Sequence, residues 1–217
     1  MRRLRPSTLR RRREEASAVA PAGGETGRPR IALGVTGGIA AYKAAGIVRG
    51  LVKAGAEVHV IMTPGGQQFI TPLTLQTLSG QPVITGQWDL SRGADVQHVA
   101  LARDLDVFLV APATADVLAR LAHGIADDFL STFYLAVTAP VALAPAMNVW
   151  MWEHPATQAN LALLKSRGAQ VIDPGEGDLA CGDEGIGRMA EPAIIVEAAL
   201  SIAKKKPRGR LRVAASS

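Results

Sequence analysis

Cysteine is almost absent from this 217-residue chain, which contains only Cys181. A single thiol excludes a disulfide framework within the chain and favours a reducing compartment, so we expect a cytoplasmic protein. No second cysteine or paired histidine is spaced for zinc, and we predict no metal site. The chain therefore depends on a hydrophobic core, and its length is enough for one domain with such a core and short tails.

Aromatic residues make up only 4% of the chain, while nearly half of all residues are apolar. This composition suits helices that pack closely on a parallel sheet. One long uncharged stretch, residues 129–152, is interrupted by Pro140 and Pro145, each of which would remove a helical hydrogen bond. The Arg-rich start lacks the apolar stretch that follows in a secretory signal. We therefore expect no membrane partner.

Excess positive charge is confined to the two ends of the chain. Residues 1–30 and residues 204–217 each carry a net charge of +6, whereas the residues between them carry −7. A protein that binds nucleic acid normally presents basic residues on its folded face, so we expect no nucleic-acid partner. We predict a disordered basic tail at 1–29, one domain at 30–204 and a basic tail at 205–217. An organelle transit peptide is the alternative for the first tail.

Apolar runs and helical segments alternate between residues 30 and 204, separated by Gly or Pro. The alternation predicts an α/β fold, with a doubly wound parallel sheet in three layers and right-handed crossovers. The expected strands are residues 30–35, 57–62, 83–84, 106–110, 141–144 and 170–172. The expected helices are residues 36–54, 72–78, 97–105, 115–123, 127–137, 155–167 and 192–204. The Gly-rich residues 173–189 are predicted to be irregular.

Small residues and prolines follow two of the expected strands, at residues 111–116 and 145–152. In an open α/β sheet, ligands bind outside the carboxyl ends of the strands. Small side chains there would let a flat ligand lie against the backbone, with Asp116 and Asn148 supplying directed hydrogen bonds. Plain helix capping is an equally good explanation for Thr114 and Asp116.

Gly37-Gly38-Ile39 follows the first strand and opens a helix. Exposed N–H groups and the positive end of the helix dipole form an anion site at such a turn. The dinucleotide fingerprint is excluded because Thr36 stands where its second glycine would be, and a P-loop is excluded because no Gly-Lys-Ser/Thr follows. A single phosphate, as on FMN, fits better than a pyrophosphate. The alternative is a tight turn that serves close packing.

Two residues have side chains suited to proton transfer. His98 lies between a polar loop and a short expected helix, and its ordinary pKa suits a proton carrier at neutral pH. Cys181 lies in a loop with glycines that is typical of a mobile lid, where a thiol can act as proton donor or nucleophile. A surface or packed histidine and an incidental buried cysteine are the simpler alternatives.

Five motifs, in this order along the chain, resemble those of the homo-oligomeric flavin-containing cysteine decarboxylases. They are Gly37-Gly38-Ile39-Ala40-Ala41-Tyr42-Lys43, Gln97-His98-Val99-Ala100-Leu101-Ala102, Pro112-Ala113-Thr114-Ala115-Asp116, Pro145-Ala146-Met147-Asn148-Val149-Trp150-Met151-Trp152, and Ala180-Cys181-Gly182-Asp183 with Gly187-Arg188-Met189. Each alone is a weak signal, but the set is specific and spans about residues 30–200. The resemblance implies a Rossmann- or flavodoxin-like flavoprotein domain.

The resemblance also implies the cofactor and the roles of individual residues. FMN would be contacted by Gly37, Gly38, Ile39, Thr63, Pro64, Gly65, Thr114, Ala115, Asp116, Val117 and Ala146. His98 would be the active-site base, Asn148 would hold the carboxylate of the substrate, and Cys181 would donate a proton late in the reaction. The substrate would be lined by Asp178, Leu179 and Ala180. Many relatives have Asn-Thr in place of Asp116-Val117, so a flavin contact of Val117 would have to use its backbone.

The implied reaction is decarboxylation of 4'-phospho-N-pantothenoylcysteine to 4'-phosphopantetheine and CO2 in coenzyme A biosynthesis. The substrate would be oxidised by the flavin to a thioaldehyde, would lose CO2, and would be reduced again from the enethiolate. Three alternatives remain open at this point. They are decarboxylation of a peptidyl cysteine, a flavin prenyltransferase activity, and a flavin-binding regulatory subunit without catalysis.

Assembly and partners are implied as well. The family builds trimers, and some members assemble these further into dodecamers, so we expect a homo-oligomer. Residues 209–214 resemble the first strand of the ligase domain that follows in bacterial bifunctional relatives. A phosphopantothenate–cysteine ligase would then be a separate partner.

Overall fold

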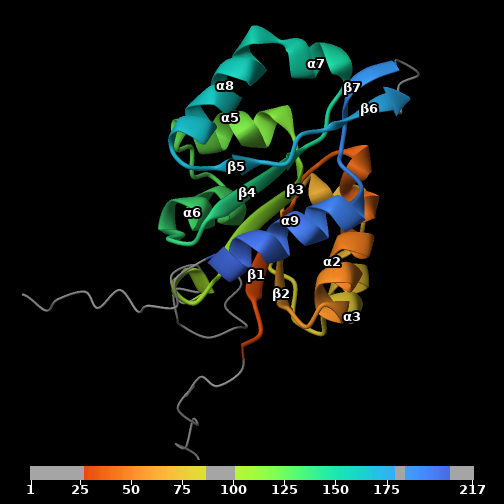
Figure 1. Ribbon diagram of the computed structural model, residues 1–217, viewed down its shortest axis with the longest axis vertical. Coiled ribbons are helices and arrows are strands. Elements are labelled where there is room, and N and C mark those ends of the chain that lie inside the picture. The colour runs from red at the N-terminus through yellow and green to blue at the C-terminus, as the bar shows by residue number, and fades with distance from the viewer. Residues whose placement is uncertain (1–26, 87–100, 179–183, 206–217) are drawn as a thin grey trace, which may run out of the picture.

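The computed structural model describes residues 27–86, 101–178 and 184–205 (Figure 1). Its centre is a parallel five-stranded sheet with the order β2-β1-β3-β4-β5. The strands are β1 (Arg30–Val35), β2 (Glu57–Met62), β3 (Val107–Ala113), β4 (Val141–Pro145) and β5 (Gln170–Val171). The chain adds β2 on one side of β1 and then crosses to β3 on the other, so the strand order reverses between β1 and β3.

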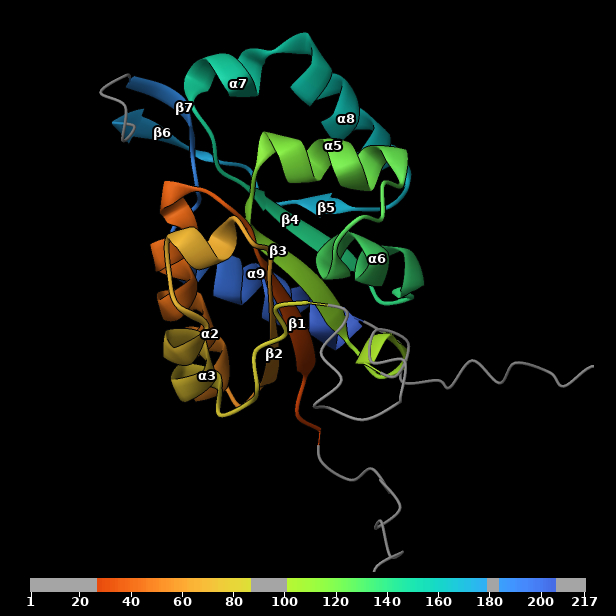
Figure 2. The ribbon, with the colours of Figure 1, turned by 180° about the vertical axis from the view of Figure 1, so that it is seen from behind.

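Helices cover both faces of the sheet, which confirms the predicted doubly wound, three-layer α/β fold (Figures 1 and 2). One face carries α2 (Ala44–Lys53), α3 (Pro72–Ser79) and α9 (Pro192–Lys205). The other face carries α5 (Ala115–His123), α6 (Phe129–Ala136) and α8 (Pro155–Ser166). A 3-10 turn, η2 (Ile39–Lys43), leads directly into α2. No described helix combines the length and apolar character needed to cross a membrane.

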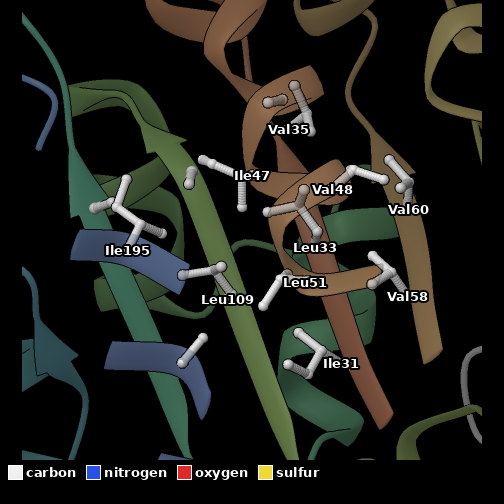
Figure 3. Close-up of a cluster of buried hydrophobic side chains, with 14 of the residues drawn as sticks. Ile31, Leu33, Val35, Ile47, Val48, Leu51, Val58, Val60, Leu109 and Ile195 are labelled. Atoms are coloured by element: carbon white, nitrogen blue, oxygen red, sulfur yellow. The ribbon is translucent and has the colours of Figure 1, made fainter. Parts of the chain in front are cut away.

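The first strand runs through the middle of the core and is buried on both sides. On the α2 face its side chains pack against those of the helix, as Figure 3 shows for Ile31, Leu33, Val35, Ile47, Val48 and Leu51. Ala32 faces the other side, where it belongs to a cluster with Phe108 and Phe133. Each large apolar side chain buried in this way contributes about 1.5–3 kcal/mol to stability. The carboxyl end of β1 is therefore held on a rigid support.

Most helix ends lie at the capping residues that the sequence indicates. The Thr114 hydroxyl accepts the Val117 N–H at 3.3 Å and begins α5, and Gly124 ends that helix with a φ of 68°. Thr71 and Gly80 have the same roles in α3. The predicted bounds of α5 are confirmed because both of its caps are visible in the sequence.

Two segments that were predicted to be loops contain regular structure. Residues 173–189 include an antiparallel hairpin of β6 (Gly175–Asp178) and β7 (Glu184–Arg188). The irregular prediction was wrong because glycine is depleted from ordinary strands, whereas here Gly177, Gly185 and Gly187 have positive φ within the hairpin. The segment 145–152 also contains most of a short helix, α7 (Val149–Glu153).

Two strand predictions differ from the structure by more than one residue. Residues 83–84 form no strand, because Ile84 makes only an isolated bridge with Ile61. Strand β3 continues to Ala113, three residues past its predicted end, and its register against β4 shifts after Val110. The strand was predicted to end at Val110, where the run of large apolar residues closes, but Pro112 lies buried within the strand.

Several predictions concern residues outside the described ranges. They are the disorder of the two tails, most of the helix at 97–105, and the roles of His98, Leu179, Ala180 and Cys181. Asp178 is placed at the end of β6 by its backbone alone. These predictions, and the domain bounds that depend on the tails, stay predictions.

Candidate functional site

A cavity of about 1010 Å³ opens where β1, β2, β3 and β4 end at the carboxyl edge of the sheet. The strand order reverses at this edge, between β1 and β3, and this is where doubly wound sheets bind ligands. The lining includes the whole set predicted to contact a cofactor: Gly37, Gly38, Ile39, Thr63, Pro64, Gly65, Thr114, Ala115, Asp116, Val117 and Ala146. Asn148 lines the same cavity. Residues chosen at four separate strand ends therefore share one site.

Gly37 and Gly65 bring the loops after β1 and β2 into backbone contact. A Cβ on Gly37 would lie 2.9 Å from the Cα of Gly65, and a Cβ on Gly65 would lie 3.2 Å from the Cα of Gly37. Neither position has room for a side chain without moving the other loop. The N-terminus of η2 follows at Gly38 and has no side-chain cap. The positive end of the helix dipole thus lies at the cavity wall.

Two buried threonine hydroxyls hold these loops in place. Thr36 is fully buried, donates to the Pro112 carbonyl oxygen at 2.6 Å and accepts from the Thr114 N–H at 3.4 Å. Thr63 accepts from the Gly66 N–H at 3.1 Å. Buried polar groups are stable only when they are paired in this way. From the sequence, Thr36 was informative only because it excludes a dinucleotide motif, and its role in tying the β1 loop to β3 was not predicted.

The start of α5 forms the acidic wall of the cavity. Thr114 is the N-cap of α5, which confirms the capping interpretation for this residue. Asp116 is not a cap: it lies in the first turn, and its two carboxylate oxygens accept hydrogen bonds from Arg120 Nε at 3.1 and 3.0 Å. Arg120 also pairs with Asp127 in the loop before α6. The hydrogen bonds to Asp116 and then Asp127 raise the pKa of Arg120. Val117 is only 4% exposed and its N–H already donates to the Thr114 hydroxyl, so the expected flavin contact through its backbone stays a prediction.

Asn148 is fixed between α7 and the hairpin strand β7. Its Oδ1 accepts the Trp150 N–H at 2.8 Å and caps α7. The preceding Met147 N–H donates to the Gly187 carbonyl oxygen at 3.0 Å. A Cβ on Gly187 would overlap with the Met147 carbonyl oxygen, so β7 lies directly against this loop. Strand β7, which ends at Arg188, therefore positions the loop that carries Asn148.

Three positively charged residues that were not predicted as site residues line the cavity: Lys43, Arg120 and Arg188. The spacing of Asp116 and Arg120, four residues apart on a helix, was a usable signal for their ion pair. Lys43 instead pairs with Glu191, which is 148 positions away in sequence. No local pattern indicates that contact.

The family model described as Flavoprotein matches residues 20–204. This chain belongs to the flavoprotein family. Its curated relatives include the coenzyme A biosynthesis bifunctional protein CoaBC of Vibrio vulnificus (strain YJ016), which is 48% identical over 178 residues, or 82% of this chain and 44% of the relative. The protein of that name from Escherichia coli (strain K12) is 49% identical over 172 residues, 79% of this chain and 42% of the relative. The flavoprotein chain therefore spans less than half the length of these relatives.

Solved structures match the described fold along almost their whole length. A PPC decarboxylase mutant complexed with pantothenoylaminoethenethiol is 32% identical, with a TM-score of 0.73 over 82% of this chain and 99% of that chain. The FMN-binding protein AtHal3 is 31% identical, with a TM-score of 0.72 over 83% and 99%. The FMN-dependent cysteine decarboxylase SpaF is 31% identical, with a TM-score of 0.69 over 81% and 97%. The expectation of a Rossmann-like flavoprotein domain is confirmed.

Proposed function

We propose that this chain decarboxylates 4'-phospho-N-pantothenoylcysteine to 4'-phosphopantetheine and CO2, with FMN as cofactor, in coenzyme A biosynthesis. The observation that carries the proposal is the cavity at the reversal of strand order. It joins a glycine turn at a helix N-terminus, small side chains and Asn148 in one space. The similarity to the PPC decarboxylase structure over 99% of that chain supports the choice of substrate.

The lining fits FMN. The turn from Gly37 to Ile39 offers backbone N–H groups and a helix dipole to one phosphate. Pro64, Ala115 and Ala146 keep side-chain bulk away from the walls, which suits a flat ring. The volume of about 1010 Å³ lies at the upper end of the range of about 300–1,000 Å³ usual for ligand pockets. A substrate can therefore lie beside the cofactor.

FMN, when bound, would supply a reversible oxidation at the carbon that carries sulfur, so that CO2 can leave without an unstabilised carbanion. The chain's own residues would bind and orient the substrate. We propose that the side-chain amide of Asn148 donates to the substrate carboxylate, because its Oδ1 is committed to the Trp150 N–H. His98 as base and Cys181 as late proton donor complete the proposal.

An Asn148→Asp variant separates capping of α7 from binding of the substrate. Aspartate can still accept the Trp150 N–H, but it would place a negative charge beside the substrate carboxylate. We expect kcat/KM for decarboxylation to fall about 30-fold or more, since like charges in contact cost several kcal/mol. FMN affinity should stay close to wild type. The matched control is Asn160→Asp. Asn160 contacts His123 at the C-terminal end of α5 and lies outside the cavity lining. Undiminished turnover by Asn148→Asp would remove Asn148 from substrate binding.

A second candidate is decarboxylation of a cysteine at the end of a peptide, because the similarity to SpaF supports cysteine decarboxylation without naming the molecule that carries the cysteine. The two are separated by measuring CO2 release from phosphopantothenoylcysteine and from a peptide that ends in cysteine. We expect release from the small substrate alone. Release from the peptide alone would favour the second candidate. FMN binding without release from either would leave two alternatives, the flavin prenyltransferase and the flavin-binding regulatory subunit.

We also propose that the chain works in the cytoplasm as a homo-oligomer, either a trimer or a larger assembly of trimers. Exposed apolar side chains at the cavity, Ile39, Tyr42 and Met151, support an assembly in which a second copy covers them. The relatives named bifunctional support a ligase as the functional partner of the decarboxylase.

A further inference from the structure

One wall of the cavity carries two cations that share a single carboxylate oxygen. Lys43 Nζ and Arg188 Nη2 each lie 3.1 Å from Glu191 Oε1. The two nitrogens are therefore within about 6 Å of each other. Lys43 ends η2, Arg188 ends β7, and Glu191 precedes α9, so three separate elements meet here. Lys43 and Arg188 both line the cavity.

The low exposure of the Lys43 side chain distinguishes this cluster from an ion pair in which both side chains are solvated. The side chain of Lys43 is only 10% exposed, and its ammonium group also donates to the Met189 carbonyl oxygen at 3.5 Å. The hydrogen bond and charge of Lys43, with a smaller effect of Arg188, lower the pKa of Glu191. Glu191 is therefore ionised at neutral pH, and the three side chains carry a net charge of +1. The lysine is held in place, while Arg188 remains about half exposed.

A second charged group in the cavity lining, at the start of α5, has the reverse net charge. Asp116 and Asp127 there surround the single guanidinium group of Arg120, and all three line the cavity. An anionic group is therefore attracted to the wall with Lys43 and Arg188 and repelled from the wall with Asp116. Within a partly enclosed cavity such a difference orients a ligand more strongly than it would in open water.

The position of Arg188 assigns this wall to the substrate rather than to FMN. Arg188 follows Gly187, whose carbonyl oxygen bonds the loop that carries Asn148. Its Nη1 lies beside Gly177 of β6, 3.8 Å from the place of a Cβ on that glycine, so the guanidinium group lies along the hairpin. Figure 1 shows β6 and β7 next to α7. The hairpin side of the cavity is thus the side of the proposed substrate-binding residues.

We propose that Arg188, supported by the buried Lys43, is a phosphate-recognition residue that binds the phosphomonoester of the substrate. This proposal rests on the proposed function and adds a specificity determinant to it. Among the described residues, the guanidinium group of Arg188 has one hydrogen-bonded side-chain partner, Glu191, through Nη2. Its planar fork of donors matches a phosphate, which Lys43 can support as a point charge. The subsite selects phosphorylated over unphosphorylated substrates.

The test measures binding to the FMN-loaded protein by titration calorimetry, with 4'-phosphopantetheine and pantetheine as probes. The wild type should bind the phosphorylated probe about tenfold or more tightly, as a charge-assisted hydrogen bond predicts. Arg188→Gln should lose this preference while its affinity for pantetheine changes little. Arg188→Lys keeps the charge without the fork and should retain part of the preference. Arg49→Gln removes an exposed charge on α2 away from the cavity lining and should behave as wild type.

Three outcomes would overturn the proposal. They are equal binding of both probes by the wild type, an equal loss for both probes in Arg188→Gln, and a selective loss of FMN over riboflavin affinity in that variant. The last would assign Arg188 to the cofactor phosphate. CO2 release from phosphopantothenoylcysteine is measured in parallel. Selective phosphate binding without CO2 release would uphold the subsite and reject the decarboxylase.

Discussion

A Gly187→Ala variant is expected to lose decarboxylation by at least about 100-fold while it still folds. The added Cβ would overlap with the backbone carbonyl oxygen of Met147, and the φ of 147° at this position disfavours any side chain. The clash is with backbone, so it can be relieved only if β7 moves away from the loop that carries Asn148. A displacement of about 1 Å at a binding group is enough for a loss of this size.

Gly177→Ala is the matched control for that variant. Gly177 lies on the paired strand of the same hairpin and has a φ of 139°, but the nearest atom to its Cβ would be the flexible end of Arg188, 3.8 Å away. It therefore has a similar conformational strain without the backbone clash. The measurement is kcat/KM for decarboxylation, together with the midpoint of thermal unfolding. Equal losses in the two variants would show that strain in the hairpin, rather than contact with Met147, decides activity.

Replacement of Gly37 by alanine is expected to weaken FMN binding by roughly ten- to a hundredfold. A Cβ at this position would lie 2.9 Å from the Cα and 3.0 Å from the carbonyl carbon of Gly65. Overpacking of this kind costs about 1–3 kcal/mol, and here the cost falls on the two loops that form the proposed phosphate site. The affinity is measured by the quenching of FMN fluorescence on titration with apoprotein.

Gly46→Ala controls for the general effect of adding a methyl group. Gly46 lies within α2, and its Cβ would only contact the Pro192 side chain at 3.5 Å. Alanine in a helix should be neutral or stabilising there. Full FMN affinity in Gly37→Ala would show that the turn after β1 takes no part in holding the cofactor.

The sequence predicted best where a local signal defines both ends of an element. The bounds of β1 and β2 are confirmed because each is a mainly apolar segment that lies between residues rich in Gly or Pro. Those of α5 are confirmed because Thr114 and Gly124 mark its ends. Within the cavity lining, residues 111–116 and 145–152 followed from one rule, that ligands bind outside the carboxyl ends of parallel strands. Their grouping in one cavity therefore did not depend on the resemblance alone.

The features that the sequence did not predict depend on contacts between distant segments. The β6–β7 hairpin is stabilised by pairing of Gly-rich strands, and its contact with Met147 tolerates only glycine at 187. Lys43 and Glu191 form an ion pair although they are 148 positions apart in sequence. Periodicity and capping describe neighbours in sequence, so they carry no information about such contacts. The roles of His98 and Cys181 rest on the resemblance and stay predictions.

CO2 release from phosphopantothenoylcysteine, measured with the same apoprotein before and after addition of FMN, shows whether this chain is a flavin-dependent decarboxylase. We predict no release without flavin, and release at a rate proportional to bound FMN once the protein has turned yellow. Release by the colourless apoprotein would show that flavin chemistry is not required. Failure of the FMN-loaded protein to release CO2 from this substrate would contradict the proposed activity.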